Sequence, residues 1–309
     1  MDFDIFLQIL IAAVAAGTPF VYAALGELIT EKSGVLNLGV EGMMLVGAIS
    51  GFIAMAKTGS LLIAVLVGMS AGALMSGIFA VLTLTLMANQ VASGLALTIF
   101  GVGLSAFLGL DYTSIALPGV PEIHLPLLAK IPVIGQLFFS FDILIYCSGF
   151  LFIAISWFLY KSKAGLILRG IGEAPKSAHA LGYNVIKIRY MAVLFGGALA
   201  GLGGVYLSVA YTPMWVEGMV AGRGWVSLAL VVFATWRPAR VMFGAYFFGA
   251  ITIAQFHVQG FGIDIPAQLL SMMPYIATII VLVLISRDQN TIRLNSPASL
   301  GITYHPDVQ

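Results

Sequence analysis

Apolar residues occur along this sequence in blocks of about twenty, the length that a helix needs to cross a hydrocarbon core of roughly 30 Å. Short stretches with polar residues, proline or glycine separate the blocks. The pattern predicts an all-α fold, a polytopic bundle of transmembrane helices with about nine spans (eight to ten), in one domain over residues 1–309. The predicted spans are residues 5–29, 34–56, 61–87, 91–110, 141–160, 191–211, 218–236, 241–258 and 267–286.

The second predicted span differs from the others because it holds Asn37, Glu41 and several glycines. Non-helical backbone at membrane depth is tolerated where protein or a water-filled cavity surrounds it. We therefore expect this segment to be bent or partly re-entrant.

Glycines recur four residues apart within the predicted spans, at Gly47/Gly51, Gly68/Gly72 and Gly197/Gly201. Small residues at this spacing let helix backbones approach closely where lipid supplies no hydrophobic drive to pack. These pairs predict helix-packing faces and imply no chemistry.

Composition excludes a soluble globular domain. Only 9% of the residues are charged and 60% are apolar, whereas soluble domains carry roughly 25% charged residues. The net charge of +1 gives no sign of a nucleic-acid partner. The expected environment is a lipid bilayer.

The longest basic loop sets the orientation. Residues 161–190 hold Lys161, Lys163, Arg169, Lys176, Lys187 and Arg189, and cytoplasmic loops are enriched in Lys and Arg. We place this loop in the cytoplasm. Counting spans backward puts residues 111–140 outside, where four prolines among apolar residues predict a structured cap.

The sequence offers no catalytic or metal-binding pattern. The phosphate-binding pattern G-x-x-x-x-G-K-[ST] is absent, and the four histidines are dispersed without metal-ligand spacing. We expect no enzyme activity, no metal and no cofactor on this chain. Acidic residues within the spans are sparse, mainly Glu27 and Glu41, which disfavours an ion-coupled secondary carrier, the alternative from another class.

A short helix is predicted in the basic loop, where residues 170–184 read GIGEAPKSAHALGYN. Proline suits the first turn of a helix, an acidic residue suits its positive end, and glycine suits its stop. The helix of about two turns presents small side chains that let a partner approach. Its residues are Glu173, Ala174, Pro175, Lys176, Ala178, Leu181 and Gly182. The alternative is an ordinary solvated loop.

This loop resembles the coupling-helix region of ABC importer permeases, and four further stretches resemble the permease family for ribose-type sugars, nucleosides and branched-chain amino acids. They are Gly34–Met44 (GVLNLGVEGMM), Asn89–Gly94 (NQVASG), Gly222–Leu230 (GRGWVSLAL) and Pro274–Ile280 (PYIATII). The proline-rich segment that ends in IPVIG resembles the nucleoside branch, which pairs with binding proteins of the basic-membrane-lipoprotein type. Within that branch the chain resembles the second, smaller permease.

The resemblance implies a permease subunit that imports nucleosides by alternating access, in a bacterial or archaeal plasma membrane. It implies three partners: an ATP-binding subunit that holds ATP and magnesium, a second homologous permease, and an extracytoplasmic binding lipoprotein. Loop 161–190 is then the coupling loop. A ribose-type sugar or a branched-chain amino acid is the alternative substrate.

Two polar clusters are candidates for the translocation path. Asn37 and Glu41 lie four residues apart, on one helix face, and Ser93 lies one turn from Asn89. The alternative for the first pair is a hydrogen bond between helices, and for the second it is helix capping.

Arg223 and Trp215 are candidates for contacts at the outer mouth. Arg223 lies between two glycines and is expected to contact either the binding protein or Glu217. Trp215 fits an interfacial aromatic belt or a stacking contact with a nucleobase.

Overall fold

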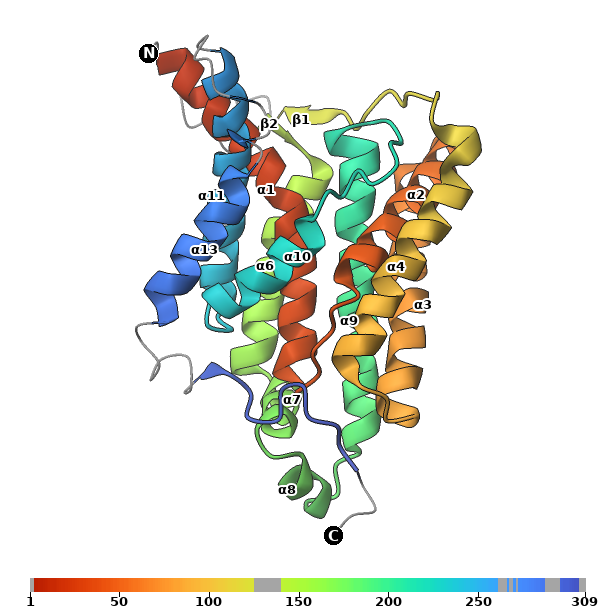
Figure 1. Ribbon diagram of the computed structural model, residues 1–309, viewed down its shortest axis with the longest axis vertical. Coiled ribbons are helices and arrows are strands. Elements are labelled where there is room, and N and C mark those ends of the chain that lie inside the picture. Colours follow the sequence, from red (N-terminus) through yellow and green to blue (C-terminus); the bar gives the residue numbers. More distant parts are fainter. Residues whose placement is uncertain are drawn as a thin grey trace.

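The computed structural model describes residues 3–124, 140–260, 266, 269–270, 272–286 and 295–305, and most of them lie in helices. Figure 1 shows an elongated bundle, with the start of α1 and the two short strands at one end and α7 and α8 at the other. We call these the strand end and the α8 end. The longer helices are α1 (Phe3–Lys32), α2 (Val40–Thr58), α3 (Leu61–Ala80), α4 (Gln90–Gly109), α6 (Ile143–Lys161), α9 (Val185–Val205) and α11 (Pro238–Gly260).

Shorter elements extend or join these helices. A π-helical turn continues α3 (Val81–Thr85) and another continues α9 (Tyr206–Tyr211), while a 3-10 turn (Leu110–Tyr112) follows α4. The remaining helices are α7 (Lys163–Glu173), α8 (Pro175–Ala180), α10 (Arg223–Phe233) and α13 (Met273–Ser286). Strands β1 (Glu122–His124) and β2 (Ser140–Asp142) pair antiparallel, with Ile123 opposite Phe141.

The all-α polytopic fold is confirmed, but the predicted count of about nine spans is not supported. Six helices of the described chain are long and apolar enough to cross a membrane, and they correspond to the first six predicted spans. The seventh prediction, 218–236, is wrong as a full span, because α10 has only 11 residues. At 1.5 Å per residue it rises about 16 Å, half of a hydrocarbon core of roughly 30 Å.

The predicted break in the second segment is confirmed. The chain leaves α1 at Lys32 and runs without helix until α2 begins at Val40, yet Asn37 is fully buried. Side chains satisfy the backbone of this buried loop. The amide of Leu36 donates to Oε1 of Gln90 (2.8 Å) and that of Asn37 to Oε1 of Glu27 (3.2 Å). A buried backbone group without such a partner would cost about 1–3 kcal/mol.

The glycine pairs predicted from the sequence join α2, α3 and α9. A Cβ on Gly47 would lie 2.4 Å from the Cα of Gly201, and one on Gly72 would lie 2.2 Å from the carbonyl oxygen of Gly197. Backbones at such distances leave no room for any side chain. The prediction of close helix packing at these positions is confirmed.

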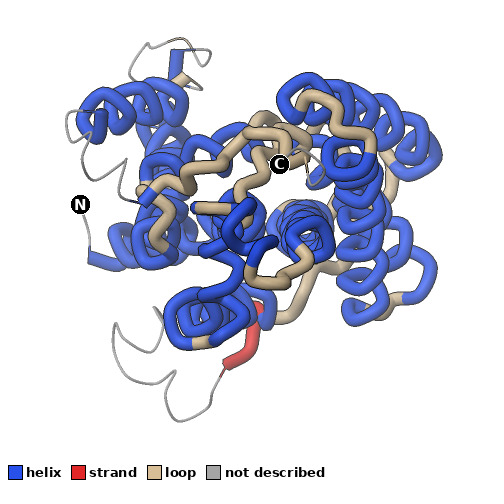
Figure 2. Tube along the Cα trace, turned by 90° about the horizontal axis from the view of Figure 1, so that it is seen from below, coloured by secondary structure: helices blue, strands red, loops and turns tan. Residues whose placement is uncertain are grey.

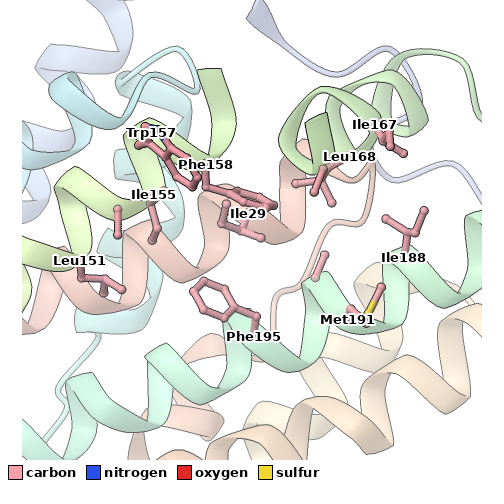
Figure 3. A pocket seen from close by; sticks show the side chains of 13 residues that line it. Ile29, Leu151, Ile155, Trp157, Phe158, Ile167, Leu168, Ile188, Met191 and Phe195 are labelled. Atoms are coloured by element: carbon pink, nitrogen blue, oxygen red, sulfur yellow. The ribbon is translucent and has the colours of Figure 1, made fainter. Parts of the chain in front are cut away.

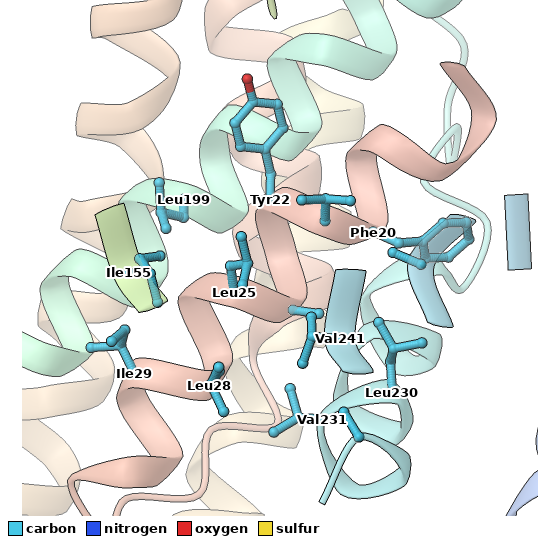
Figure 4. Close-up of a cluster of buried hydrophobic side chains, with 14 of the residues drawn as sticks. Phe20, Tyr22, Leu25, Leu28, Ile29, Ile155, Leu199, Leu230, Val231 and Val241 are labelled. Carbon is cyan, nitrogen blue, oxygen red and sulfur yellow. The ribbon is translucent and has the colours of Figure 1, made fainter. Parts of the chain in front are cut away.

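The apolar core on the other side of α9 is formed by α1, α6, α9, α10 and α11, as Figure 4 shows. It includes Leu25 and Leu28 of α1, Ile155 of α6 and Leu230 of α10, all buried. The hydroxyl of Tyr22 in this core donates to the carbonyl of Leu144 in α6. The core therefore fixes the short α10 against the long helices.

The predicted cap and the predicted basic loop lie at opposite ends of the bundle. The described part of the cap includes β1 and β2 at the strand end, whereas α7 and α8 lie at the α8 end (Figure 1). Residues 125–139 of the cap lie outside the described residues. This arrangement agrees with the predicted placement of the two loops on opposite sides of a membrane.

Candidate functional site

The helix predicted in the basic loop is present as α8. It begins at Pro175, and it ends at Ala180, just before Gly182, whose φ of +87° is the left-handed conformation that favours glycine. The preceding helix α7 is capped by Ser162, whose Oγ accepts from the amide of Gly165 at 2.9 Å. Local sequence signals thus determine both ends of this segment.

One face of α8 packs on the bundle and the other is exposed. Ala178 is buried and packs with Ile171 of α7 and Val185 of α9. Leu181 directly after the helix is 77% exposed, and Ala174 directly before it is exposed as well. Glu173 and Lys176 are also exposed. The segment presents an aliphatic side chain and small residues at the end of the molecule.

The described C-terminal residues hold the end of α1, α7 and α9 together at the α8 end of the bundle. Figure 2 shows this end from below. The buried Arg189 of α9 donates from Nη2 to Oγ of Ser299 (2.9 Å) and from Nε to the carbonyl of Ser33 (3.0 Å). The amide of Ser299 donates to the carbonyl of Gly172 (2.9 Å). These contacts were not predicted, because nothing in the sequence around Arg189 or Ser299 indicates a partner so far along the chain.

The buried carboxylate of Glu41 caps the start of α10. Its Oε1 accepts from the amide of Gly222 (2.8 Å) and its Oε2 accepts from the amide of Gly224 (2.7 Å). The first amides of a helix have no partner within the helix and carry partial positive charge, so a carboxylate is a favourable cap. A Cβ on Gly224 would lie 2.5 Å from the Cα of Glu41, which requires glycine there. Glu41 therefore joins α2 to α10 by hydrogen bonds, which was the alternative to a position lining the translocation path.

Asn37 and Asn89, two of the other predicted path residues, also have structural partners. Oδ1 of Asn37 accepts from the amide of Gly39 (2.9 Å), and Oδ1 of Asn89 caps α4 by accepting from the amide of Ala92 (3.0 Å). Ser93 is buried in the same helix. Asn37 lies within the buried loop and Glu41 lies in the first turn of α2, so the predicted shared helix face of these two residues is wrong, while Asn89 is exposed at the start of α4.

The stretches that carry the family resemblance meet in space. The start of α4 packs on the buried loop, since a Cβ on Gly94 would lie 2.8 Å from the amide nitrogen of Leu38. Glu41 joins this loop and α2 to the start of α10. The hydroxyl of Tyr275 in α13 donates to the carbonyl of Ala221 (3.1 Å). Four separate segments thus form one connected structure around α10.

The two outer-mouth candidates are placed differently from the prediction. Trp215 is only 1% exposed and packs on Gly109, where a Cβ would overlap the indole, so it offers no surface to a partner. Nη1 of Arg223 donates to the carbonyls of Met219 (3.0 Å) and Val220 (3.1 Å), which closes the turn before α10. Trp215 was misplaced because an apolar aromatic residue fits a buried site and a membrane interface equally well.

A cavity of about 290 Å³ lies beside the start of α10, between α1, α11 and α13. Arg223 reaches it from α10, and Thr252 and Gln255 reach it from α11. Oε1 of Gln255 is buried without a hydrogen-bond partner, whereas the hydroxyl of Thr252 donates to the carbonyl of Phe248 (2.9 Å). The complete lining is Phe20, Ala221, Arg223, Val226, Thr252, Gln255, Pro274 and Tyr275. No sequence pattern marks Thr252 and Gln255, because they are single polar residues in an apolar run.

The sequence matches the protein family described as branched-chain amino acid transport system / permease component over residues 9–283. It is 38% identical to the putative glucose ABC transporter permease protein TsgC13 of Haloferax volcanii, over 96% of this chain and 97% of that protein. It is 35% identical to the nucleoside ABC transporter permease protein NupC of Lactococcus lactis subsp. cremoris, over 90% and 92% of the two chains. It is 33% identical to the guanosine ABC transporter permease protein NupQ of Bacillus subtilis, over 91% and 93%.

No solved structure matches the chain. The matches with family and relatives nevertheless cover nearly all of it, and they agree with the resemblance carried by the stretches around α10 and α8. The chain therefore belongs to the branched-chain amino acid transport permease family and is a multi-pass membrane permease subunit of an ABC transporter, without an ATPase site of its own.

Proposed function

We propose that this permease imports nucleosides. The observation that supports this substrate is the similarity, at 33% and 35% identity, to two permeases named for guanosine and nucleoside transport. The nucleoside branch is also the one that the proline-rich segment before residue 136 resembles. Such a substrate combines a ribose with a base, so it needs hydrogen-bonding groups and apolar surface together.

Glucose is the second candidate, because the Haloferax volcanii relative at 38% identity is named a putative glucose permease. Both candidates carry a ring with several hydroxyl groups. A path that accommodates sugar hydroxyls suits either substrate, so transport assays have to separate them.

The chain works with an ATP-binding subunit, as the family implies. The proposal adds a second homologous permease, an extracytoplasmic binding lipoprotein and a plasma-membrane location in a bacterium or archaeon. We assign α8 and its flanks, Glu173 to Gly182, to the contact with the ATP-binding subunit. The exposed Leu181 and the small residue Ala174 suit a partner groove, and α8 lies between α7 and α9, so a displacement of α8 reaches the bundle directly.

We assign the cavity beside α10 to the substrate path. It combines Arg223, Thr252 and Gln255 with apolar neighbours, and interrupted helices at membrane depth are tolerated where they line such a space. The non-helical residues before α10 and α10 itself then form one broken pass, and α11 and α13 also cross the bilayer. Glu41 and Asn37 support this wall of the path through the start of α10, and Asn89 and Ser93 support it through α4.

Uptake of labelled nucleosides tests the substrate. Cells that lack the gene are compared with complemented cells, with glucose and leucine as comparison substrates. The proposal predicts that only nucleoside uptake falls and that the gene restores it. A selective loss of glucose uptake would support the second candidate, and unchanged uptake of all three would contradict both.

A double substitution tests the coupling role of α8. Ala174→Asp with Leu181→Asp adds two charges to the exposed segment, and we expect uptake to stop while the permease remains in the membrane at normal amounts. Ile302→Asp is the matched control, because Ile302 is an exposed aliphatic residue at the same end of the bundle. Normal uptake by the double variant would refute the coupling role.

A further inference from the structure

An apolar groove of about 750 Å³ opens between α1, α6, α7 and α9, toward the α8 end of the bundle (Figure 3). Leu151 and Trp157 line it from α6, Ile167 from α7, and Met191 and Phe195 from α9. Trp157 is 62% exposed and Met191 52% exposed, so the groove is open to the surroundings of the protein.

The chemistry of this lining selects an apolar occupant. All residues that line the groove are apolar, and water in such a space would have no polar partners. If the groove were empty, the side chains around it would also lack dispersion contacts on that side. In a bilayer, the acyl chains of lipids are the apolar groups that can fill such a groove.

The opening of the groove at the α8 end carries positive charge. Lys163 is exposed in the first turn of α7 and lies one turn before Ile167. Lys187 is exposed on α9, next to Ile188 and one turn before Met191, and both of these line the groove. Side chains three or four residues apart share a helix face, so both ammonium groups lie at the edge of the apolar surface.

Few carboxylates lie on the helices that line the groove. On α6, α7 and α9 the one carboxylate is Glu173, the last residue of α7 and ten residues after Lys163, and its Oε2 accepts from the amide of Ala298 at 3.4 Å. Residues 143–172 and 182–205 contain no Asp or Glu. On α1, which also lines the groove through Ile29, Glu27 accepts from the amide of Asn37 and Glu31 accepts from the indole of Trp236. Both of these carboxylates are buried.

We propose that this groove is a binding site for an anionic phospholipid, with one acyl chain in the groove and the headgroup phosphate between Lys163 and Lys187. Basic pockets between transmembrane helices on the cytoplasmic side bind anionic lipid headgroups. The bound lipid bridges α7 and α9, the two helices that flank α8. The proposal uses the family assignment and the predicted orientation, and it does not depend on the transported substrate.

The test measures lipid retained by the full permease, purified in mild detergent with the subunits that co-purify. After exposure to mixed phosphatidylglycerol and phosphatidylcholine, native mass spectrometry counts each lipid per permease chain. The expected result is one retained phosphatidylglycerol per chain and no preference for phosphatidylcholine. The double variant Lys163→Gln with Lys187→Gln is expected to retain it about 30-fold more weakly, the equivalent of about 1 kcal/mol for each lysine.

Two further variants separate the groove from general surface charge. Met191→Trp fills the groove without altering charge and is expected to reduce retention of phosphatidylglycerol. Lys57→Gln, at an exposed lysine at the strand end, is expected to leave retention unchanged. Equal retention of both lipids, or retention unchanged in the lysine and Met191 variants, would overturn the proposal. A cross-link from Met191→Cys to a second permease would overturn it as well, because a protein would then cover the groove.

Discussion

The carboxylate of Glu41 caps the first turn of α10, and its replacement by glutamine is expected to loosen that turn. In the native chain two amides donate to two different oxygens, at 2.8 Å from Gly222 and 2.7 Å from Gly224. An ionised carboxylate only accepts hydrogen bonds, whereas a glutamine side chain has one accepting oxygen and one donating NH₂ group. Glu41→Gln therefore retains one of the two bonds and places a donor against the other amide.

The expected cost follows from the lost bond. A hydrogen bond to a charged group contributes about 1.5–3 kcal/mol. Because Glu41 is buried, the amide that loses its partner lies in a buried site. We expect a loss of about 2 kcal/mol in the free energy of unfolding. At about 2–4 °C per kcal/mol for a chain of a few hundred residues, this corresponds to a decrease in Tm of roughly 4–8 °C.

Thermal melting of the purified permease measures the decrease, and amide hydrogen exchange locates it. Exchange is expected to accelerate at residues 222–226 and to stay unchanged in α3. Glu217→Gln is the matched control, because Glu217 is an exposed glutamate in the loop that precedes α10, where a substitution changes stability by less than about 0.5 kcal/mol. A Glu41→Gln protein that melts within 1 °C of the native one, with unchanged exchange at 222–226, would refute the capping role.

Three further outcomes are expected. Gly72→Ala is expected to destabilise the permease by about 1–3 kcal/mol in thermal melting, because the added Cβ meets the backbone of α9. The control Gly103→Ala, whose Cβ meets nothing within 4 Å, is expected to be neutral or stabilising. Equal melting of the two variants would contradict the close packing. Gln255→Leu is expected to slow nucleoside uptake about tenfold, because the cavity loses one hydrogen-bonding group. The control Gln8→Leu, at an exposed position of α1, is expected to leave uptake unchanged. Normal uptake by the Gln255 variant would show that this cavity is not part of the substrate path. Arg189→Ala frees the C-terminal residues, so limited proteolysis is expected to cleave them faster, and an unchanged cleavage rate would show that other contacts suffice to hold them.

The sequence predicted those parts of the fold that depend on local patterns. Apolar blocks predicted the first six spans. The glycines and Asn37 in the second block predicted that its start is not helical. Pro175 and Gly182 predicted the limits of α8, because each acts through its own backbone conformation. The close packing of α3 on α9 was predictable because spacing of four residues places glycines on one helix face.

The parts that were missed depend on backbone turns and on distant partners. The apolar run 218–236 looks like a span, yet positive φ angles at Ala221 (50°) and Gly222 (81°) place a turn before α10, and those at Thr235 (48°) and Trp236 (52°) place another after it. Hydropathy does not distinguish an apolar turn from an apolar helix. The cavity beside α10 was also missed, because its walls come from four helices and no local pattern marks Gln255.

Transport by purified components tests whether the permease complex imports nucleosides at the expense of ATP. Proteoliposomes that contain this permease with its second permease and ATP-binding subunit are loaded with ATP and given the binding protein outside, and uptake of labelled guanosine and of labelled glucose is measured. We expect guanosine uptake that requires ATP inside the proteoliposomes and that excess unlabelled glucose does not inhibit. Guanosine uptake that is independent of ATP, or ATP-dependent uptake of glucose without guanosine, would contradict this proposal.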